Sequence, residues 1–236
     1  MKVTLRIKRY NPEKDHEPHF QDFEVEAEND QERILDLHQE IKTKYDGTLT
    51  FRRSCAHGVC GSGGMKIDGR NRLACQTLIR NIYYKRPVVI EPLPSMPIIK
   101  DLVVDQGDFF RKYEATKPYF ISNTPPPADS ERLQTNEDAE RIFDAAKCVL
   151  CACCTSSCPS IWSDVNYIGP SALVKVSRFV FDSRDEAREE RRDITDVPDG
   201  AWRCHTIFNC VEACPKGINV TWHISALKRE LSKREI

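Results

Sequence analysis

Long apolar runs are missing from this chain of 236 residues. Its longest apolar stretches, such as Leu102–Val104, are broken by charges within a few residues, whereas a membrane-spanning helix needs about 20 apolar residues. We therefore expect that the chain does not cross a membrane by itself. No leader segment precedes the alternating residues that follow Met1, so we expect the mature protein to begin here in a reducing compartment.

An excess of charge of either sign is missing too. Lysine and arginine together number 35, and aspartate and glutamate number 36, so no overall field attracts nucleic acid or an acidic substrate. We expect no nucleic-acid partner. No internal repeat is visible, and the length suits one large domain or two small ones. The patterns along the chain favour two.

The first part of the chain carries strand signals. Residues 3–7 alternate apolar and polar side chains, and Phe23 and Val25 repeat the pattern, which predicts two half-buried strands. Asn29 or Asp30 is expected to cap a helix. The apolar face of that helix comprises Ile34, Leu37, His38 and Ile41. A strand around Leu49 and Phe51, a hairpin from Met65 to Cys75 and a last strand from Val88 to Glu91 are also predicted.

Helical patterns replace the strand signals from about residue 100. Three consecutive prolines, Pro125 to Pro127, predict an exposed connection. Pro170 is expected as the first residue of a helix with Leu173, Val176 and Val180 on its apolar face. The charged run from Arg184 to Asp193 is predicted to be a solvated helix face without a binding role. We predict domains at residues 1–105 and 106–236.

Cysteine is abundant, with eleven residues in the chain. In a reducing compartment, metal binding explains so many cysteines better than disulfides do. One run is Cys148-x2-Cys151-x2-Cys154-x3-Cys158-Pro159, the spacing with which bacterial-type ferredoxins hold cubane clusters. In that arrangement the fourth cysteine binds a second cluster, which requires a second run. The second run comprises Cys204, Cys210 and Cys214, with Ile207 in the place of the middle cysteine.

Crossing the fourth ligands divides these seven cysteines into two sets. Cys148, Cys151, Cys154 and Cys214 form a four-thiolate set that suits a [4Fe–4S] cluster. Cys158, Cys204 and Cys210 form a three-thiolate set, and because Ile207 offers no ligand we infer a [3Fe–4S] cluster there. Tetrahedral zinc is the alternative, but zinc sites do not need this crossed pattern. Cys153 is left over and is predicted to be a buried structural thiol.

Three further cysteines lie in the first part of the chain. Cys55-x4-Cys60, followed by Cys75 after the hairpin, is close to the plant-type spacing for a [2Fe–2S] cluster. The third cysteine of that spacing would fall at Gly63. The fourth ligand is then Ser62, His57, a backbone group or water, with Ser62 and water ranked above His57. Four glycines make the loop permissive, and a merely flexible loop is the alternative to a cluster loop.

With these motifs the chain resembles the iron–sulfur subunits of succinate dehydrogenase and fumarate reductase over essentially its whole length. The segments that carry the resemblance are Phe51 to Cys55, Gly58 to Ser62, Asn71 to Cys75, Pro92 to Pro94, Lys100 to Asp105, both ferredoxin runs, Phe181 to Asp185 and Cys214 to Gly217. The resemblance implies an α+β protein, with an N-terminal β-grasp domain like plant-type ferredoxins followed by an all-α domain like bacterial ferredoxins.

The resemblance also implies a function. Electrons would pass from FAD in a flavoprotein subunit through the [2Fe–2S], [4Fe–4S] and [3Fe–4S] clusters to membrane quinone, and this chain would carry no catalytic residue of its own. Membrane anchor subunits, which can hold haem b, would keep the chain peripheral on the cytoplasmic face of the bacterial inner membrane. The positions that match the family's quinone pocket are Pro159, Ser160, Trp162, His205 and Ile207.

Two of these positions have a plainer interpretation. Relatives commonly have two consecutive tryptophans where this chain has Trp162-Ser163, so Trp162 either packs or donates its indole N–H to a quinone. His205 directly follows a predicted ligand and is either a proton-linked partner of the quinone, a residue that supports the neighbouring ligand, or an ordinary surface residue. Two other functions also stay open. One is a fumarate reductase subunit, which Gly63 weakly disfavours because many fumarate reductases have a cysteine there. The other is a polyferredoxin with soluble partners.

Overall fold

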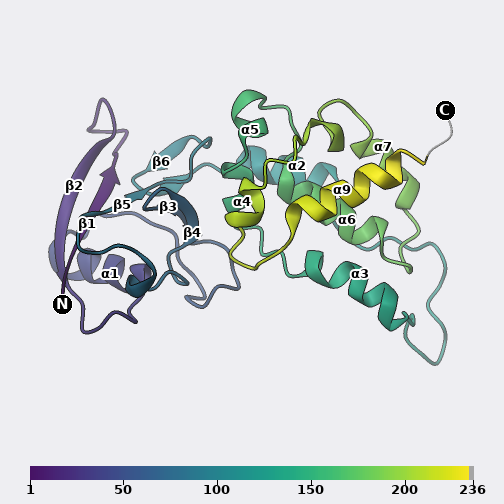
Figure 1. Cartoon of the computed structure of the whole chain (residues 1–236), viewed down its shortest axis with the longest axis horizontal. Helices are drawn as coiled ribbons and strands as arrows, with labels where there is room; N and C mark the ends of the chain where they lie inside the picture. The colour runs from purple at the N-terminus through teal and green to yellow at the C-terminus, as the bar shows by residue number, and fades with distance from the viewer. Residues whose placement is uncertain (234–236) are drawn as a thin grey trace. The chain divides into compact units, whose positions relative to one another are not determined.

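The computed structural model describes residues 1–233, and the chain divides into two compact units. The first unit holds Met1–Gln106 together with Val149–Ser157. The second holds Gly107–Cys148 and the described chain from Cys158 onward. Strands gather in the first unit and helices in the second (Figure 1). Within the described residues, no helix is both long and apolar enough to span a membrane.

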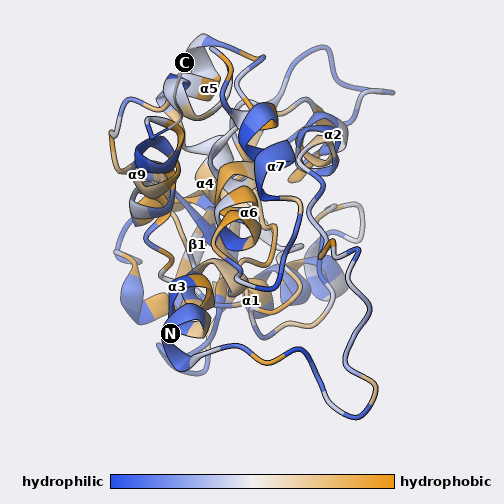
Figure 2. Ribbon diagram, turned by 90° about the vertical axis from the view of Figure 1, so that its right-hand side faces the viewer, coloured by the Kyte–Doolittle hydropathy of each residue, from blue (hydrophilic) through white to orange (hydrophobic). Residues whose placement is uncertain are grey.

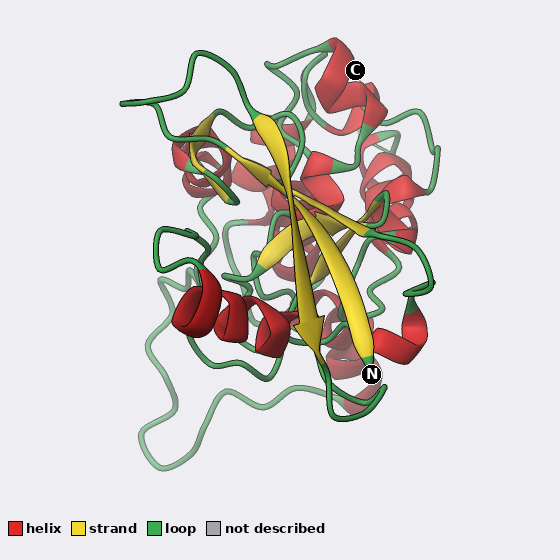
Figure 3. Ribbon diagram, turned by 90° about the vertical axis from the view of Figure 1, so that its left-hand side faces the viewer, coloured by secondary structure: helices red, strands yellow, loops and turns green. Residues whose placement is uncertain are grey.

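Five strands form a mixed sheet in the first unit (Figure 3). Their bounds are β1 Lys2–Arg9, β2 His19–Glu26, β3 Gly64–Ile67, β4 Arg70–Leu73 and β5 Val88–Glu91. They lie in the order β2-β1-β5-β3-β4, and only the β1–β5 pair is parallel among them. A separate two-stranded sheet pairs β6 (Ile98–Lys100) with β7 (Val103–Val104).

The predicted alternation in the first strand is confirmed. Val3, Leu5 and Ile7 are each at most 1% exposed, because every second side chain of β1 points into the core. The predicted helix is also present as α1 (Ile34–Glu40), which continues into a π-helical turn, η1 (Ile41–Tyr45). The sheet and this helix bury one apolar core, which is the α+β arrangement that the sequence predicts.

Three local predictions in this unit are wrong. The residue that caps α1 is Arg33, whose side chain and backbone both bond the carboxylate of Asp36, while Asn29 caps a tight turn instead. Leu49 is buried but forms no strand. The backbone N–H of the next residue, Thr50, donates a hydrogen bond to the carboxylate of Asp101 and so is not available to a neighbouring strand. The strand β5 is not the last, since β6 and β7 follow it.

Helices make up the second unit. Their bounds are α2 Gly107–Ala115, α3 Asn136–Ala146, α5 Pro159–Ser163, α6 Pro170–Val180, α7 Arg188–Thr195, α8 Asn209–Glu212 and α9 Val220–Leu231, with a 3₁₀ turn, η3, at Ala201–Arg203. The first unit contains two further short turns, η2 (Ile79–Asn81) and α4 (Cys153–Ser156). The prolines at 125–127 lie in an exposed connection between α2 and α3, as predicted.

The core of the second unit is built around α6, which packs against α2, α3, α7 and α9. Pro170 is its first residue, and Leu173, Val176 and Val180 are buried on it, as the sequence predicts. Figure 2 shows α6 mostly apolar and α7 mostly polar. The mostly polar α7 therefore packs directly against the apolar α6.

The charged run is not wholly a solvated face. Arg191 on α7 is 0% exposed and forms an ion pair with the buried Asp185. Its guanidinium also donates to the carbonyl oxygens of Lys117 and Tyr119. A buried charge is tolerated where it is paired and fully hydrogen-bonded, which is the arrangement here.

Candidate functional site

None of the eleven cysteines, all of which lie within the described residues, forms a disulfide, and they lie in the segments whose spacing predicts cluster ligands. Within residues 1–233, no group of three or more His, Cys, Asp or Glu side chains is packed tightly enough to hold a single metal ion. The three proposed ligand sets differ in where they lie: one is in the first unit, one is in the second, and one has members in both.

Cys55, Cys60 and Cys75 belong to the first unit, in the loop before β3 and at the end of β4. The Sγ of Cys55 accepts backbone N–H groups from Cys60 at 3.3 Å, Val59 at 3.4 Å and His57 at 3.5 Å. These N–H groups lower the pKa of Cys55 to about 6. Burial instead raises the pKa of Cys75. The loop therefore stabilises a thiolate at Cys55, the form that binds iron.

The backbone of this loop is held in a turn by left-handed residues. Ala56, Gly58 and Gly61 have φ angles of 59°, 79° and 71°. A Cβ atom at Gly61 would lie 2.3 Å from the carbonyl oxygen of Val149, so no side chain fits there. The loop is thus a fixed structure in which N–H groups face sulfur, and this favours the cluster-loop interpretation over a merely flexible loop.

Gly63 differs from its neighbours. A Cβ atom built there would meet nothing closer than the carbonyl oxygen of Arg52 at 3.7 Å. Among the candidates for the fourth ligand, Ser62 places its Oγ 3.2 Å from the Sγ of Cys60. The ring Nδ1 of His57 lies 2.5 Å from the carbonyl oxygen of Cys55 and is engaged by the loop itself. This geometry favours Ser62 over His57.

The four-thiolate set has members in both units. Cys151 and Cys154 lie in the first unit, buried beside α4, where Leu150 and Ala152 adopt left-handed backbone angles. Cys148 and Cys214 lie in the second unit, and the Sγ of Cys214 accepts the N–H of Ile218 at 3.4 Å.

Cys153, the cysteine left over by the spacing analysis, is fully buried in the first unit, as predicted. A Cβ atom at Gly64 would come within 3.4 Å of its Sγ. The thiol therefore packs against the strand that begins at Gly64.

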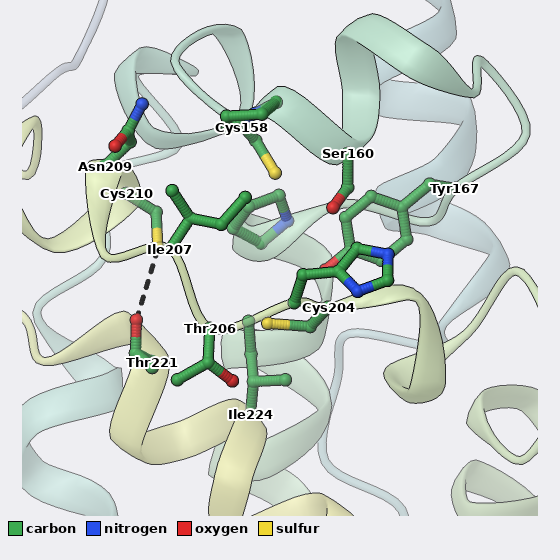
Figure 4. Close-up of a pocket in the computed structure, with 13 residues that line it drawn as sticks. Cys158, Ser160, Tyr167, Cys204, Thr206, Ile207, Asn209, Cys210, Thr221 and Ile224 are labelled. Atoms are coloured by element: carbon green, nitrogen blue, oxygen red, sulfur yellow. Dashed lines mark hydrogen bonds between the residues drawn. The ribbon is translucent and has the colours of Figure 1, made fainter.

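The three-thiolate set comes together in the second unit. Cys158 precedes α5, Cys204 follows η3 and Cys210 lies on α8. All three line one cavity, which we call the three-cysteine cavity, and Figure 4 shows their sulfur atoms around a shared space. Ile207 lines the same cavity, and Thr206 and Phe208 beside it have φ angles of 58° and 72°. The loop therefore turns around the position that would hold a fourth cysteine.

Hydroxyl groups surround these thiols. The Oγ1 of Thr221 lies 3.5 Å from the Sγ of Cys210 (Figure 4). Tyr167, in the loop between α5 and α6, is 0% exposed and lines the same cavity. Its Oη makes no hydrogen bond of ordinary geometry with any described residue. Burial, together with the thiols of Cys204 and Cys158, raises the pKa of Tyr167.

This unpaired hydroxyl tests whether the cavity suits an iron–sulfur cluster. A buried hydroxyl that makes no hydrogen bond destabilises the folded protein by about 1–3 kcal/mol. An acceptor bound in the cavity would remove this cost. The bridging sulfides of a cluster held by the three thiols would be such acceptors. The residues present therefore fit a cluster.

Four of the five predicted quinone-site residues share this cavity: Pro159, Ser160, His205 and Ile207. Trp162 does not line it, although it lies on the same short helix, α5. The Oγ of Ser160 donates to the carbonyl oxygen of Arg203 at 3.1 Å, so this hydroxyl is already engaged.

Sequence reasoning missed Tyr167 and Thr221. No spacing rule connects either residue to the cysteines, because each comes from a segment between or after the ligand runs. The only signal was a hydroxyl-bearing residue between the two runs and another shortly after the second, and such residues are too common in this part of the chain to single them out.

The comparisons with known proteins agree with this geometry. A family model described as a 2Fe-2S iron-sulfur cluster binding domain matches residues 4–111, and one described as a 4Fe-4S dicluster domain matches residues 140–215. The chain is 41% identical to a succinate dehydrogenase iron-sulfur subunit of Coxiella burnetii, covering 97% of each chain.

Two further comparisons point the same way. Identity is 43% to a mitochondrial succinate dehydrogenase [ubiquinone] iron-sulfur subunit of Candida glabrata, covering 97% of this chain and 91% of the relative. Among solved structures, a chain of the Mycobacterium smegmatis Sdh1 complex in the apo form matches with a TM-score of 0.85 and 26% identity, covering 99% of this chain and 97% of that one.

Proposed function

Because the chain belongs to the family of succinate dehydrogenase iron–sulfur subunits, we propose that it passes electrons from FAD in a flavoprotein subunit to membrane quinone. Electron relay is the role of the family, and the two matching domain models describe a 2Fe-2S and a 4Fe-4S dicluster domain. When bound, the clusters supply a series of one-electron carriers, and the chain itself holds, buries and tunes them.

The proposal assigns ten cysteines to three clusters. Cys55, Cys60 and Cys75 hold the [2Fe–2S] cluster, with Ser62 or water as the fourth ligand. The [4Fe–4S] cluster is held by Cys148, Cys151, Cys154 and Cys214, and the [3Fe–4S] cluster by Cys158, Cys204 and Cys210. The domains proposed to hold them are residues 1–105 and 106–236.

The three-cysteine cavity is the observation that carries this proposal. It combines three thiols with an isoleucine at the position of a fourth, which supports a cluster that lacks one iron. Burial raises the pKa of both Cys158 and Cys210, and a bound cation stabilises the thiolate form of a buried cysteine. Iron supplies that charge.

The surface beside this cavity supports a membrane-side partner. Trp162 on α5, Val165 just after it, and Ile207 and Phe208 are all apolar and exposed, although large apolar side chains are more often buried. We propose that membrane anchor subunits, with haem b where they hold it, cover this surface and keep the chain peripheral on the cytoplasmic face of the inner membrane. Quinone would then bind near Pro159, Ser160, Trp162, His205 and Ile207.

Metal and sulfide analysis of the purified complex tests the cluster assignment. We expect about nine iron atoms and about ten acid-labile sulfides in this chain, an EPR signal from an oxidised three-iron centre, and succinate-dependent quinone reduction. A preparation that holds zinc and no sulfide would overturn the assignment. A fully loaded protein that reduces no quinone with succinate, but exchanges electrons with soluble carriers, would favour the polyferredoxin alternative.

A further inference from the structure

Two of the hydroxyl groups that line the three-cysteine cavity interact with its thiols, and their situations differ. The Oγ1 of Thr221 already has the Sγ of Cys210 as a partner at 3.5 Å. The Oη of Tyr167 makes no hydrogen bond of ordinary geometry with any described residue, although the side chain is fully buried and interacts with the thiol of Cys204. Figure 4 shows the Tyr167 ring at the edge of the cavity, on the side of Ser160 and Cys204.

No described neighbour of Tyr167 accepts its proton in a hydrogen bond of ordinary geometry. The hydroxyl of Ser160 is committed to the carbonyl oxygen of Arg203. The remaining lining residues are the three cysteines, the apolar Pro159, Pro170, Ile207 and Ile224, and the polar His205, Thr206, Asn209 and Thr221. A phenylalanine would fill the same space without a buried, unsatisfied hydroxyl, so packing alone does not account for tyrosine here.

We propose that Tyr167 donates a hydrogen bond to a sulfur atom of the cluster held in the three-cysteine cavity, and thereby raises the reduction potential of that cluster. This inference rests on the proposed [3Fe–4S] cluster. A hydrogen bond to sulfur withdraws electron density and stabilises the reduced, more negative cluster, so the last carrier in the chain attracts electrons more strongly. Tyr167 is thus a positioning residue that acts on the reduction potential of the cluster.

The test is an EPR-monitored redox titration of the three-iron centre in the purified complex, with wild type and Tyr167→Phe. The variant should keep the oxidised three-iron signal, and the equilibrium constant for its reduction should fall by about twofold to tenfold, where tenfold corresponds to about 59 mV. Tyr119→Phe removes the same hydroxyl from an exposed side chain of the second unit and should leave the potential unchanged.

A second variant covers the case in which Tyr167→Phe fails to assemble. Site-specific 3-fluorotyrosine at position 167 keeps the ring and makes the hydroxyl a stronger donor, so it should raise the potential. An intact three-iron signal whose potential does not move in the phenylalanine or fluorotyrosine form would overturn the inference. Absence of the three-iron signal from fully loaded wild type would instead overturn the proposed cluster, so the two failures are distinguishable.

Discussion

Gly63→Cys is the sharpest test of the first cluster site, because the structure has room for a side chain there. A Cβ atom at Gly63 would lie 3.7 Å from the nearest atom, whereas at Gly61 and Gly64 it would lie 2.3 Å and 2.7 Å from carbonyl oxygens. Gly63 also avoids the left-handed backbone angles that Gly58 and Gly61 adopt. A cysteine can therefore enter the position of the missing ligand without moving the loop.

The expected magnitude follows from the ligand exchange. Thiolate donates more electron density than oxygen, so a fourth cysteine should lower the potential of the [2Fe–2S] cluster. Replacing two of four thiolates in Rieske centres raises the potential by about 250 mV or more, so one exchange should shift it by about 100 mV. For a one-electron carrier this is roughly fiftyfold in the equilibrium constant. The backbone change alone should stabilise the loop by about 0.4–1 kcal/mol.

Redox titration followed by EPR, with wild type, Gly63→Cys and Gly63→Ala in the purified complex, measures the shift. Alanine is the matched control, since it gives the same backbone restriction without a ligand and should leave the potential unchanged. Ser62→Ala should prevent normal loading of the cluster only if serine is the fourth ligand; otherwise the variant loses just the contact with the Sγ of Cys60, and the cluster should still load. A loaded Gly63→Cys protein with the wild-type potential would refute the missing-ligand argument, and wild type without any [2Fe–2S] signal would end this interpretation of the first unit.

Three other outcomes are expected. Ile207→Cys should convert part of the three-iron centre to a [4Fe–4S] form of lower potential and slow quinone reduction; an unchanged EPR signal of the oxidised three-iron centre would contradict the ligand set. His205→Gln should slow quinone reduction more than electron transfer from succinate to a flavin-level acceptor, and equal losses would mean that His205 supports assembly. Burial lowers the pKa of His38 from 6.5 to about 4, and neither ring nitrogen has a hydrogen-bond partner among residues 1–233. The unfolded chain therefore gains a proton first as the pH falls, and about 3 kcal/mol of stability should be lost between about pH 6.5 and 4. Thermal unfolding at pH 7 and 5.5 should show a smaller decrease in His38→Leu than in wild type.

Regular periodicity was readable from the sequence wherever burial alone decides the structure. The alternation in β1 and the helical face of α6 are examples, because a period of two or 3.6 residues puts every apolar side chain on one face. Leu49 shows the limit of that rule. It is as buried as any strand residue, but the carboxylate of Asp101, 52 positions along the chain, takes the adjacent backbone N–H and so prevents a strand ladder.

The burial of charged and polar side chains was harder to predict, because it too depends on partners that are distant in the sequence. Arg191 looked solvent-exposed in a run of charges, but it is buried because Asp185 and two backbone carbonyls from residues 117 and 119 satisfy its guanidinium. Tyr167 likewise interacts with three thiols, those of Cys158, Cys204 and Cys210, and two of them lie more than 35 residues away in the sequence. Ligand spacing was visible because cluster chemistry fixes it locally, whereas the groups that satisfy a buried polar atom are chosen by the fold.

Ile207 connects cluster chemistry with surface chemistry. In the proposed three-iron site it removes a ligand, and it is also 49% exposed beside the exposed Phe208. A cysteine at this position would supply a fourth thiolate and would also replace an apolar surface side chain with a smaller one. Slower quinone reduction in Ile207→Cys could therefore arise from the cluster or from the surface. Ile207→Val separates the two, because valine offers no ligand but trims the surface: an unchanged cluster with slower quinone reduction would assign the effect to the surface, and normal turnover would assign it to the cluster.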